Sequence, residues 1–173
     1  MREFLYFLPR KALFWNFIII SMISLELIAL YYQYALHESP CAICVQIRSV
    51  VMFMGFTGLF GLMVKNNKKL IWLPLLALLS QIGGVLILGS KALHIERGDV
   101  LSTCGMDAGF PVWMKLDQWL PWMFEPKGLC GKAIQLIPGV LNITMVEALY
   151  YGFIAAMIGY VSILVIYLFS ENK

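Results

Sequence analysis

Four long apolar stretches constrain this chain more than any other feature. They comprise residues 12–32, 44–64, 70–90 and 148–169. A helix needs about 20 apolar residues to cross the hydrocarbon core of a membrane, and each stretch meets that length. Because lipid offers a backbone no hydrogen-bond partners, we expect these segments to be helices. The sequence therefore predicts an all-α membrane protein, a bundle of four transmembrane helices in a single domain of residues 1–173.

The composition agrees with this fold class. Charged residues make up 13% of the chain, whereas soluble domains carry about 25%. The predicted spans contain only two charged residues, Glu26 in the first and Arg48 in the second. A formal net charge of +3, with no basic stripe of interleaved aromatic residues, argues against nucleic-acid binding.

The basic residues predict how the chain is oriented. Short cytoplasmic loops carry an excess of Lys and Arg. Such residues precede the first span and connect the second to the third: Arg2, Arg10, Lys11, Lys65, Lys68 and Lys69. The 33–43 loop has none, and the long 91–147 segment can cross the membrane regardless of its charges. We therefore expect both termini in the cytoplasm and the 33–43 and 91–147 loops outside. The first stretch is too long for a cleaved signal peptide, so we expect a retained helix.

The outer segment, residues 91–147, is predicted to contain a short interfacial helix. Large apolar side chains, several of them Trp, crowd between residues 110 and 124. Amphipathic helices rich in Trp lie in the headgroup region of a membrane. A loop that packs on itself is the alternative interpretation. The crowded side chains are Phe110, Trp113, Leu116, Trp119, Leu120, Trp122, Met123 and Phe124.

Two further patterns concern helix ends and helix packing. Thr144 followed by Glu147 has the spacing of a capping box, which predicts the start of the fourth helix. Gly55, Gly58 and Gly61 recur along the second span. Small residues at such spacing allow helices to approach closely in lipid, so we interpret these glycines as packing residues.

Cys41 and Cys44 form a Cys-Ala-Ile-Cys motif directly after Pro40, at the expected outer start of the second helix. The free N–H groups and positive dipole end of a helix start stabilise a thiolate. The thiolate is the form of cysteine that attacks disulfides. The spacing also allows the two sulfurs to bond to each other. The motif therefore predicts a redox-active pair that faces the outer, oxidising side.

Cys104 and Cys130 lie further along, in the outer segment, and two interpretations are open for them. A structural disulfide between them would stabilise the fold by about 3 kcal/mol. Alternatively, they form a second redox pair that exchanges with the first. A zinc site is expected to need a second closely spaced cysteine pair, which the sequence lacks, so we predict no metal.

Arg48 lies one helical turn deeper than Cys44, on the same predicted helix face. A charge at that depth marks a functional site by default, and its guanidinium could hold a thiolate or donate to a quinone oxygen. A snorkelling arginine that only marks the interface is the alternative.

Glu26 has a similar depth, and we expect it to share a hydrogen-bonded network with Arg48. The alternative is a protonated Glu26 bonded within its own helix. His94 is expected to be a solvated loop residue rather than a proton shuttle.

Together these features resemble the bacterial disulfide bond formation protein B (DsbB) family. The resemblance covers nearly the whole chain. It is carried by the second cysteine pair in a long outer loop and by four motifs, Leu25-Glu26-Leu27, Pro40-Cys41-x-x-Cys44-x-x-x-Arg48, Phe110-Pro111-x-Trp113 and Leu116-Asp117-x-Trp119-x-Pro121.

The resemblance implies a thiol:quinone oxidoreductase of the bacterial inner membrane, with its cysteines on the periplasmic side. A reduced thioredoxin-fold oxidase of the DsbA type would attack Cys104 and leave the Cys104–Cys130 pair reduced. Cys130 or its pair would then exchange with Cys41. Cys44 would pass the electrons to ubiquinone or menaquinone, with Arg48 binding the quinone. This implication favours a redox role for the second pair.

Three other functions are consistent with the motifs. One is a variant oxidase that serves a single specialised partner. Another is a non-catalytic protein of four spans held together by structural disulfides. The third is a protein similar to vitamin K epoxide reductase, in which we would expect the CxxC motif near the last helix.

Overall fold

Four long helices dominate the computed structural model, which describes residues 8–99, 107–128, 135–137 and 141–171. The helices are α2 (Ala12–Tyr34), α3 (Ala42–Val64), α4 (Trp72–Glu96) and α7 (Met145–Glu171). Each is long and apolar enough to span a membrane. The predicted all-helical fold with four spans is therefore confirmed.

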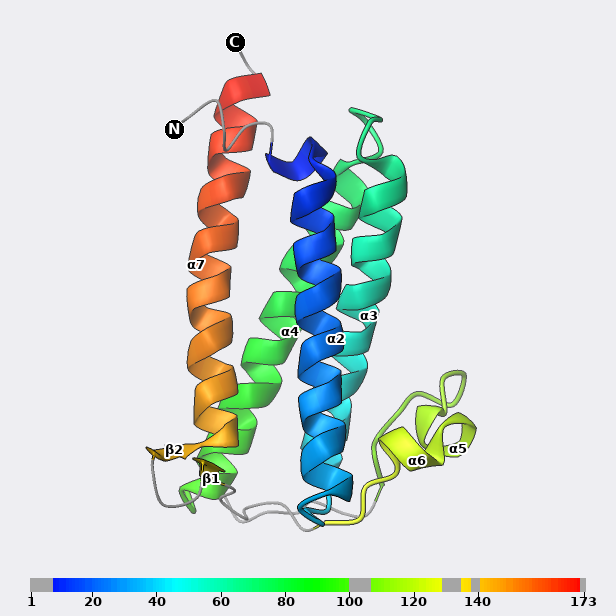
Figure 1. Cartoon of the computed structure of the whole chain (residues 1–173), viewed down its shortest axis with the longest axis vertical. Coiled ribbons are helices and arrows are strands. Elements are labelled where there is room, and N and C mark those ends of the chain that lie inside the picture. The colour runs from blue at the N-terminus through cyan, green and yellow to red at the C-terminus, as the bar shows by residue number, and fades with distance from the viewer. Residues whose placement is uncertain (1–7, 100–106, 129–134, 138–140, 172–173) are drawn as a thin grey trace.

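The long helices pack in chain order, so that α2 contacts α3, α3 contacts α4, and α4 contacts α7 (Figure 1). The short 3-10 helix η1 (Leu8–Arg10), the α3–α4 turn and the last residues of α7 lie at one end of the bundle. The α2–α3 loop lies at the other end, with the remaining short elements. Short connections join α2 to α3 and α3 to α4, as is usual for an up-and-down arrangement, whereas the long segment between Glu96 and Met145 joins α4 to α7.

All four helices extend beyond their predicted limits, and α4 and α7 do so by the most. Helix α4 continues to Glu96 and ends where Gly98 adopts a positive φ of 79°, a backbone conformation that glycine adopts easily at helix ends. Helix α7 begins at Met145 because Thr144 and Glu147 cap it reciprocally. The Thr144 N–H donates to the Glu147 carboxylate at 3.3 Å, and the Glu147 N–H donates to the Thr144 hydroxyl at 3.1 Å. The predicted capping box is confirmed.

The aromatic part of the outer segment forms two short helices, α5 (Leu116–Trp119) and α6 (Pro121–Phe124). Pro121 interrupts the helical hydrogen bonding because it lacks an N–H, yet it suits the first position of a new helix. Some of the side chains form a small core with the first turns of α3, whereas three Trp side chains stay exposed. The core residues are Val45, Ala108, Leu116, Met123 and Phe124, and the exposed residues are Trp113, Trp119 and Trp122.

A short antiparallel hairpin, β1 (Gln135–Ile137) and β2 (Leu141–Thr144), precedes α7 and was not predicted. Gln135 pairs with Thr144 and Ile137 with Leu141. The sequence contains one signal for it, because the Pro138-Gly139 dipeptide between the strands is typical of turns. The hairpin contacts α7, and it lies at the same end of the bundle as the α2–α3 loop (Figure 1).

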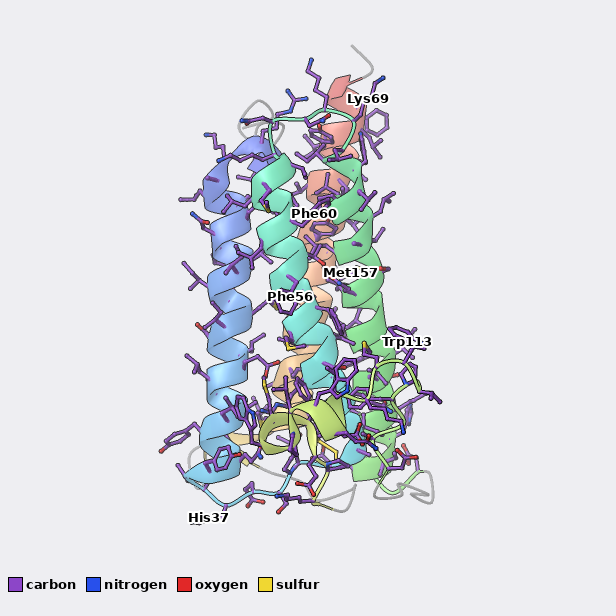
Figure 2. The ribbon with its side chains drawn as sticks, turned by 90° about the vertical axis from the view of Figure 1, so that its right-hand side faces the viewer. His37, Phe56, Phe60, Lys69, Trp113 and Met157 are labelled. Atoms are coloured by element: carbon purple, nitrogen blue, oxygen red, sulfur yellow. A yellow bond between two sulfur atoms is a disulfide. The ribbon has the colours of Figure 1, made fainter. Side chains whose placement is uncertain are left out.

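The interior of the bundle is apolar, and so is much of its outside. Trp15, Leu75 and Tyr167 are fully buried between the helices. Phe56 and Phe60 of α3 point outward (Figure 2) and are exposed. Large apolar side chains on the outside of a long helix indicate that lipid, rather than water, surrounds it.

The glycines of α3 allow α2 to approach closely, as predicted. A Cβ atom at Gly61 would overlap the ring of Trp15, and one at Gly58 would lie 2.9 Å from a side-chain carbon of Ile19. Because both partners lie on α2, the absent side chains set the distance between the two helices.

Replacement of Gly61 by Ala is expected to destabilise the protein by about 1–3 kcal/mol, the usual range for overpacking a core. The reason is that the new methyl group meets the fully buried ring of Trp15. Unfolding in detergent micelles by SDS titration, followed by circular dichroism, measures the change. Gly84→Ala is the matched control, because no described atom outside its own helix turn lies within 4 Å of its added Cβ. Equal unfolding midpoints for the two variants would contradict the close packing.

Candidate redox site at the start of α3

Cys41 and Cys44 form a disulfide at the first turn of α3, and their Cα atoms lie 5.0 Å apart. Cys41 is the N-cap residue, with the extended backbone typical of that position. Its sulfur accepts a hydrogen bond from the Cys44 N–H at 3.2 Å. A sulfur in this place, at the positive end of the helix dipole, is stabilised as a thiolate when the disulfide is reduced.

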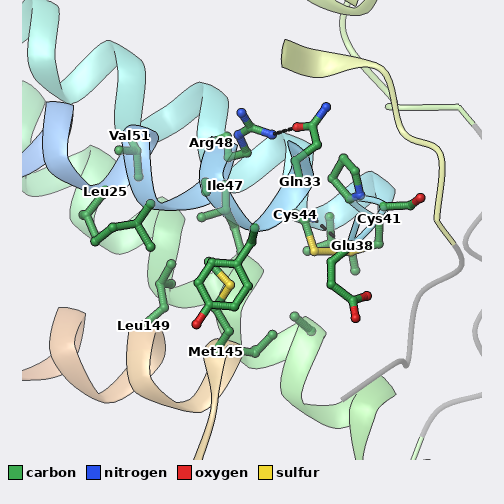
Figure 3. A pocket seen from close by; sticks show the side chains of 18 of the residues that line it. Leu25, Gln33, Glu38, Cys41, Cys44, Ile47, Arg48, Val51, Met145 and Leu149 are labelled. Carbon is green, nitrogen blue, oxygen red and sulfur yellow. Dashed lines mark hydrogen bonds between the residues drawn. A yellow bond between two sulfur atoms is a disulfide. The ribbon is translucent and has the colours of Figure 1, made fainter. Parts of the chain in front are cut away.

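Arg48, one turn further along α3, is held by two side chains of α2. Its Nη1 donates to Gln33 Oε1 at 2.7 Å (Figure 3), and its Nε donates to Glu26 Oε2 at 3.4 Å. The Arg48 and Glu26 side chains are only 8% and 13% exposed. The juxtaposition of Glu26 and Arg48 that the sequence predicts is therefore present.

Gln33 completes this network and was missed by sequence reasoning. It lies seven residues after Glu26, a spacing that returns a side chain to the same helix face, and this was the available signal. Its Nε2 also donates to the backbone carbonyl of Trp122 at 3.1 Å. Gln33 thereby links the buried guanidinium to the short helix α6.

The network leaves two polar atoms unsatisfied. Among the described residues, neither Nη2 of Arg48 nor Oε1 of Glu26 has a hydrogen-bond partner. Buried polar atoms are rarely left in this state unless a ligand, water or functional role accounts for them. With the disulfide closed, Nε and Nη1 of Arg48 donate to side chains of α2. Its Nη2 can therefore donate to a further hydrogen-bond acceptor.

A cavity of about 160 Å³ lies beside the disulfide, between α2, α3, α4 and α7 (Figure 3). Its wall is largely apolar and includes Leu25, Ile47, Val51 and Leu149. Both cysteines and the charged side chains of Glu26, Glu38, Arg48 and Glu96 also line it. An apolar cavity of about 150 Å³ is enough to hold a benzene ring, so this one has room for a single six-membered ring.

A second cavity, of about 390 Å³, shares Leu25 and Leu149 with the first. Its other lining residues come from further along the same helices, toward the end of the bundle that carries η1. They include Met22, Met54, Phe153 and Ala156. The two cavities therefore adjoin at Leu25 and Leu149, and the second extends away from the disulfide along the spans.

The outer segment is fastened to the residues around the disulfide. The Pro40 carbonyl accepts hydrogen bonds from the N–H groups of Lys127 and Gly128, both at 3.0 Å. Gln46, on the first turns of α3, donates to the Ala108 carbonyl at 2.8 Å. A Cβ atom at Gly128 would overlap the Ser39 carbonyl, so only glycine fits this contact.

The second predicted cysteine pair, Cys104 and Cys130, lies outside the described residues. Its disulfide and its redox role therefore remain predictions. His94 is within the described part, where its Nδ1 lies 3.1 Å from the Asp99 carboxylate and its side chain is 62% exposed. His94 is therefore solvated, as predicted, but it lies in the last turn of α4 and not in a loop, because the helix continues to Glu96.

The fold and the site together define a multi-pass membrane protein with a thiol–disulfide centre at one end of its helical bundle. A comparison with families of known proteins agrees, because the model of the family described as disulfide bond formation protein DsbB matches residues 11–162. The chain belongs to the DsbB family, and it is an oxidoreductase involved in disulfide bond formation.

Individual relatives are similar over most of their length. The chain is 30% identical over 165 residues to disulfide bond formation protein B of Aliivibrio fischeri, which covers 95% of both chains. It is 34% identical over 133 residues to that of Aeromonas salmonicida, covering 76% of this chain and 77% of the relative. The protein of Vibrio alginolyticus is 32% identical over 126 residues, with coverages of 72% and 76%.

Replacement of Glu26 by Leu is expected to destabilise the protein by about 3–5 kcal/mol, because it leaves the buried charge of Arg48 without its counter-ion. The double variant Glu26→Leu/Arg48→Met is expected to regain most of this loss, since two apolar residues need no partners. A double-mutant cycle of unfolding free energies in detergent measures the coupling. Additive effects of the two substitutions would show that the ion pair is energetically unimportant.

Replacement of Gly128 by Ala is expected to break the hydrogen bonds to Pro40, because the new methyl group overlaps the Ser39 carbonyl. Hydrogen exchange at the Lys127 and Gly128 amides should then be at least about tenfold faster, as expected for a loss of about 1.4 kcal/mol. Mass spectrometry of peptic fragments reads this exchange. Gly152→Ala is a suitable control, because Gly152 lies in α7 away from Pro40 and no described atom outside its own helix turn lies within 4 Å of the added Cβ. Unchanged protection in Gly128→Ala would exclude the anchoring role.

Proposed function

We propose that this protein is a membrane thiol:quinone oxidoreductase. It reoxidises a periplasmic dithiol oxidase of the DsbA type and passes the electrons to a membrane quinone, which sustains disulfide formation in secreted proteins. One observation carries the proposal: the Cys41–Cys44 disulfide of a DsbB-family chain lines an apolar, ring-sized cavity inside the spans.

The residues around this cavity fit a quinone. A quinone head group is a flat ring with two carbonyl oxygens, so it needs apolar walls and a hydrogen-bond donor. Ile47 and Leu149 provide apolar wall, and Arg48 provides the donor that lacks a partner among the described residues. The second cavity gives an isoprenoid tail an apolar path along the spans. Ubiquinone, or menaquinone without oxygen, would supply a two-electron acceptor in this place.

Each side chain of the site then has a definite task. The start of α3 stabilises a thiolate at the reduced cysteine pair, with the Cys44 N–H already directed at the Cys41 sulfur. Glu26 and Gln33 fix the guanidinium of Arg48, so that its free donor group points to a constant position. The apolar walls exclude water, which strengthens the interaction between Arg48 and an oxygen that gains charge.

The second cysteine pair connects this centre to the partner protein. The partner's thiolate attacks Cys104, and a mixed disulfide forms as Cys130 is released. The partner leaves oxidised, and Cys130 or its pair exchanges with Cys41. Cys130 follows the anchored Gly128 by only two positions in the sequence, and this short tether to Pro40 supports the exchange.

The proposed orientation places the disulfide in the periplasm and both termini in the cytoplasm. The arrangement of the bundle supports it, because the basic residues of η1 and of the α3–α4 turn share one end. Lys69 lies at that end and His37 at the opposite end, near the disulfide (Figure 2). A relay of this kind requires an oxidising space at the disulfide and lipid around the acceptor.

The experiment that tests the proposal reconstitutes the purified protein in liposomes that contain ubiquinone. A reduced DsbA-type protein is added, and quinone reduction is followed by ultraviolet absorbance. The wild type should reduce the quinone, and Cys44→Ala should abolish the reaction. Cys104→Ala should block transfer from the partner, yet its Cys41–Cys44 pair should still be oxidised by quinone, as thiol trapping would show.

Two results would contradict the proposal. If Cys104→Ala oxidises the partner at the wild-type rate, the order of transfer is wrong. If thiol trapping finds both cysteine pairs oxidised in membranes with and without quinone, the disulfides are structural. Ser80→Ala provides a control that should keep the wild-type rate, because Ser80 is exposed on α4 and lines neither cavity.

A further inference from the structure

Glu96 is a carboxylate for which the proposed relay provides no task. It is the last residue of α4, and it lines the same cavity as Cys44. Its Oε2 accepts a hydrogen bond from the Thr144 hydroxyl at 3.3 Å. Its Oε1 is buried and has no hydrogen-bond partner among the residues that the structure describes. One carboxylate oxygen is therefore fixed, and the other is available.

Polar groups connect Glu96 to the outer surface. The Thr144 hydroxyl that donates to Glu96 also accepts the Glu147 N–H at 3.1 Å. The Glu147 carboxylate in turn lies 3.4 Å from the Arg97 guanidinium, and the two side chains are 26% and 54% exposed. This polar cluster begins at the wall of an apolar cavity and ends in contact with water.

The chemistry of the cavity requires a proton from water. A reduced pair that consists of one thiolate and one thiol loses two electrons and one proton when its disulfide closes. A quinone that becomes a quinol gains two electrons and two protons. One proton per cycle must therefore enter from the aqueous side, to replace the proton that the thiolate had released there.

The other charged groups of the cavity are less suited to supply this proton. Arg48 stays protonated in proteins. Glu26 is already engaged as the counter-ion of Arg48 at 3.4 Å. Glu38 lies in the loop before the disulfide and has interactions of its own. Glu96 alone combines a hydrogen bond to a surface-connected hydroxyl with an available oxygen.

We propose that Glu96 is the proton-transfer residue of this site, an inference that rests on the proposed function. In its protonated form it gives its proton to an oxygen of the reduced quinone, and the second proton comes from the remaining cysteine thiol. The resulting carboxylate is then protonated again from water at this end of the bundle, where the Thr144 hydroxyl holds it beside the partly exposed side chains of Glu147 and Arg97. The dithiol is oxidised to the disulfide, and the quinone is reduced to the quinol.

Glu96→Gln tests this directly, because Gln keeps the shape and the acceptor for the Thr144 hydroxyl but transfers no proton. Single-turnover quinone reduction by the prereduced protein is expected to be about 10²-fold slower, within the usual range for loss of a general acid. Glu96→Asp should recover much of the rate. Glu125→Gln is the matched control, because Glu125 pairs with Lys127 on the outer surface and lies outside the cavity; its rate should equal that of the wild type.

A second readout does not depend on turnover. The infrared spectrum of the reduced, quinone-free protein should contain the carbonyl stretch of a protonated carboxylic acid. This band should shift in deuterated water, because Glu96 lies at the end of α4 and exchanges its proton with solvent. It should be absent in Glu96→Gln and present in Glu125→Gln. Without this band in the wild type, Glu96 would hold no proton to transfer, and the inference would be overturned.

The possible results separate this inference from the proposed function. If the wild type neither binds nor reduces quinone, as judged by calorimetry and absorbance, the proposed function fails. If the wild type does both and Glu96→Gln reduces quinone at the same rate, the proton-transfer role of Glu96 is overturned alone. A band that persists in Glu96→Gln would likewise overturn it.

Discussion

The burial of the Arg48 guanidinium determines much of this structure. A charge within an apolar bundle is costly unless partners satisfy it, and both partners, Glu26 and Gln33, come from the neighbouring helix. Helix α2 must therefore pack on α3 in one register, which the glycines of α3 allow. The same pairing fixes the wall of the cavity and leaves one guanidinium nitrogen directed away from its partners.

The disulfide depends on this arrangement because it occupies the first turn of the helix that carries the arginine. Cys41 caps α3, and Pro40 before it accepts two hydrogen bonds from the outer segment. A helix start has free N–H groups, so sulfur chemistry is favoured there. The residues just before a helix start retain free carbonyls, so a second segment can be bound there. Residues 40–44 therefore both carry the disulfide and bind the outer segment.

Some of these features were predictable because they depend on local pattern. The four spans follow from apolar length, the start of α7 from Thr144 and Glu147, and the contact between Glu26 and Arg48 from equal depth in adjacent spans. The roles of Gln33 and Glu96 were not predictable, because each depends on which neighbour faces it across the bundle. The hairpin before α7 was missed because its strands, of three and four residues, are too short to show the alternation of apolar and polar residues that indicates a strand.

The hydrogen bonds that fasten the outer segment have a mechanical consequence. Gln46 holds the segment at Ala108, and Pro40 holds it at Gly128. Gln46 belongs to α3 and Pro40 immediately precedes Cys41, so residues 108–128 form a loop that is attached at both ends to the start of one helix. A force that displaces this loop therefore acts on the helix turn that contains the two sulfurs.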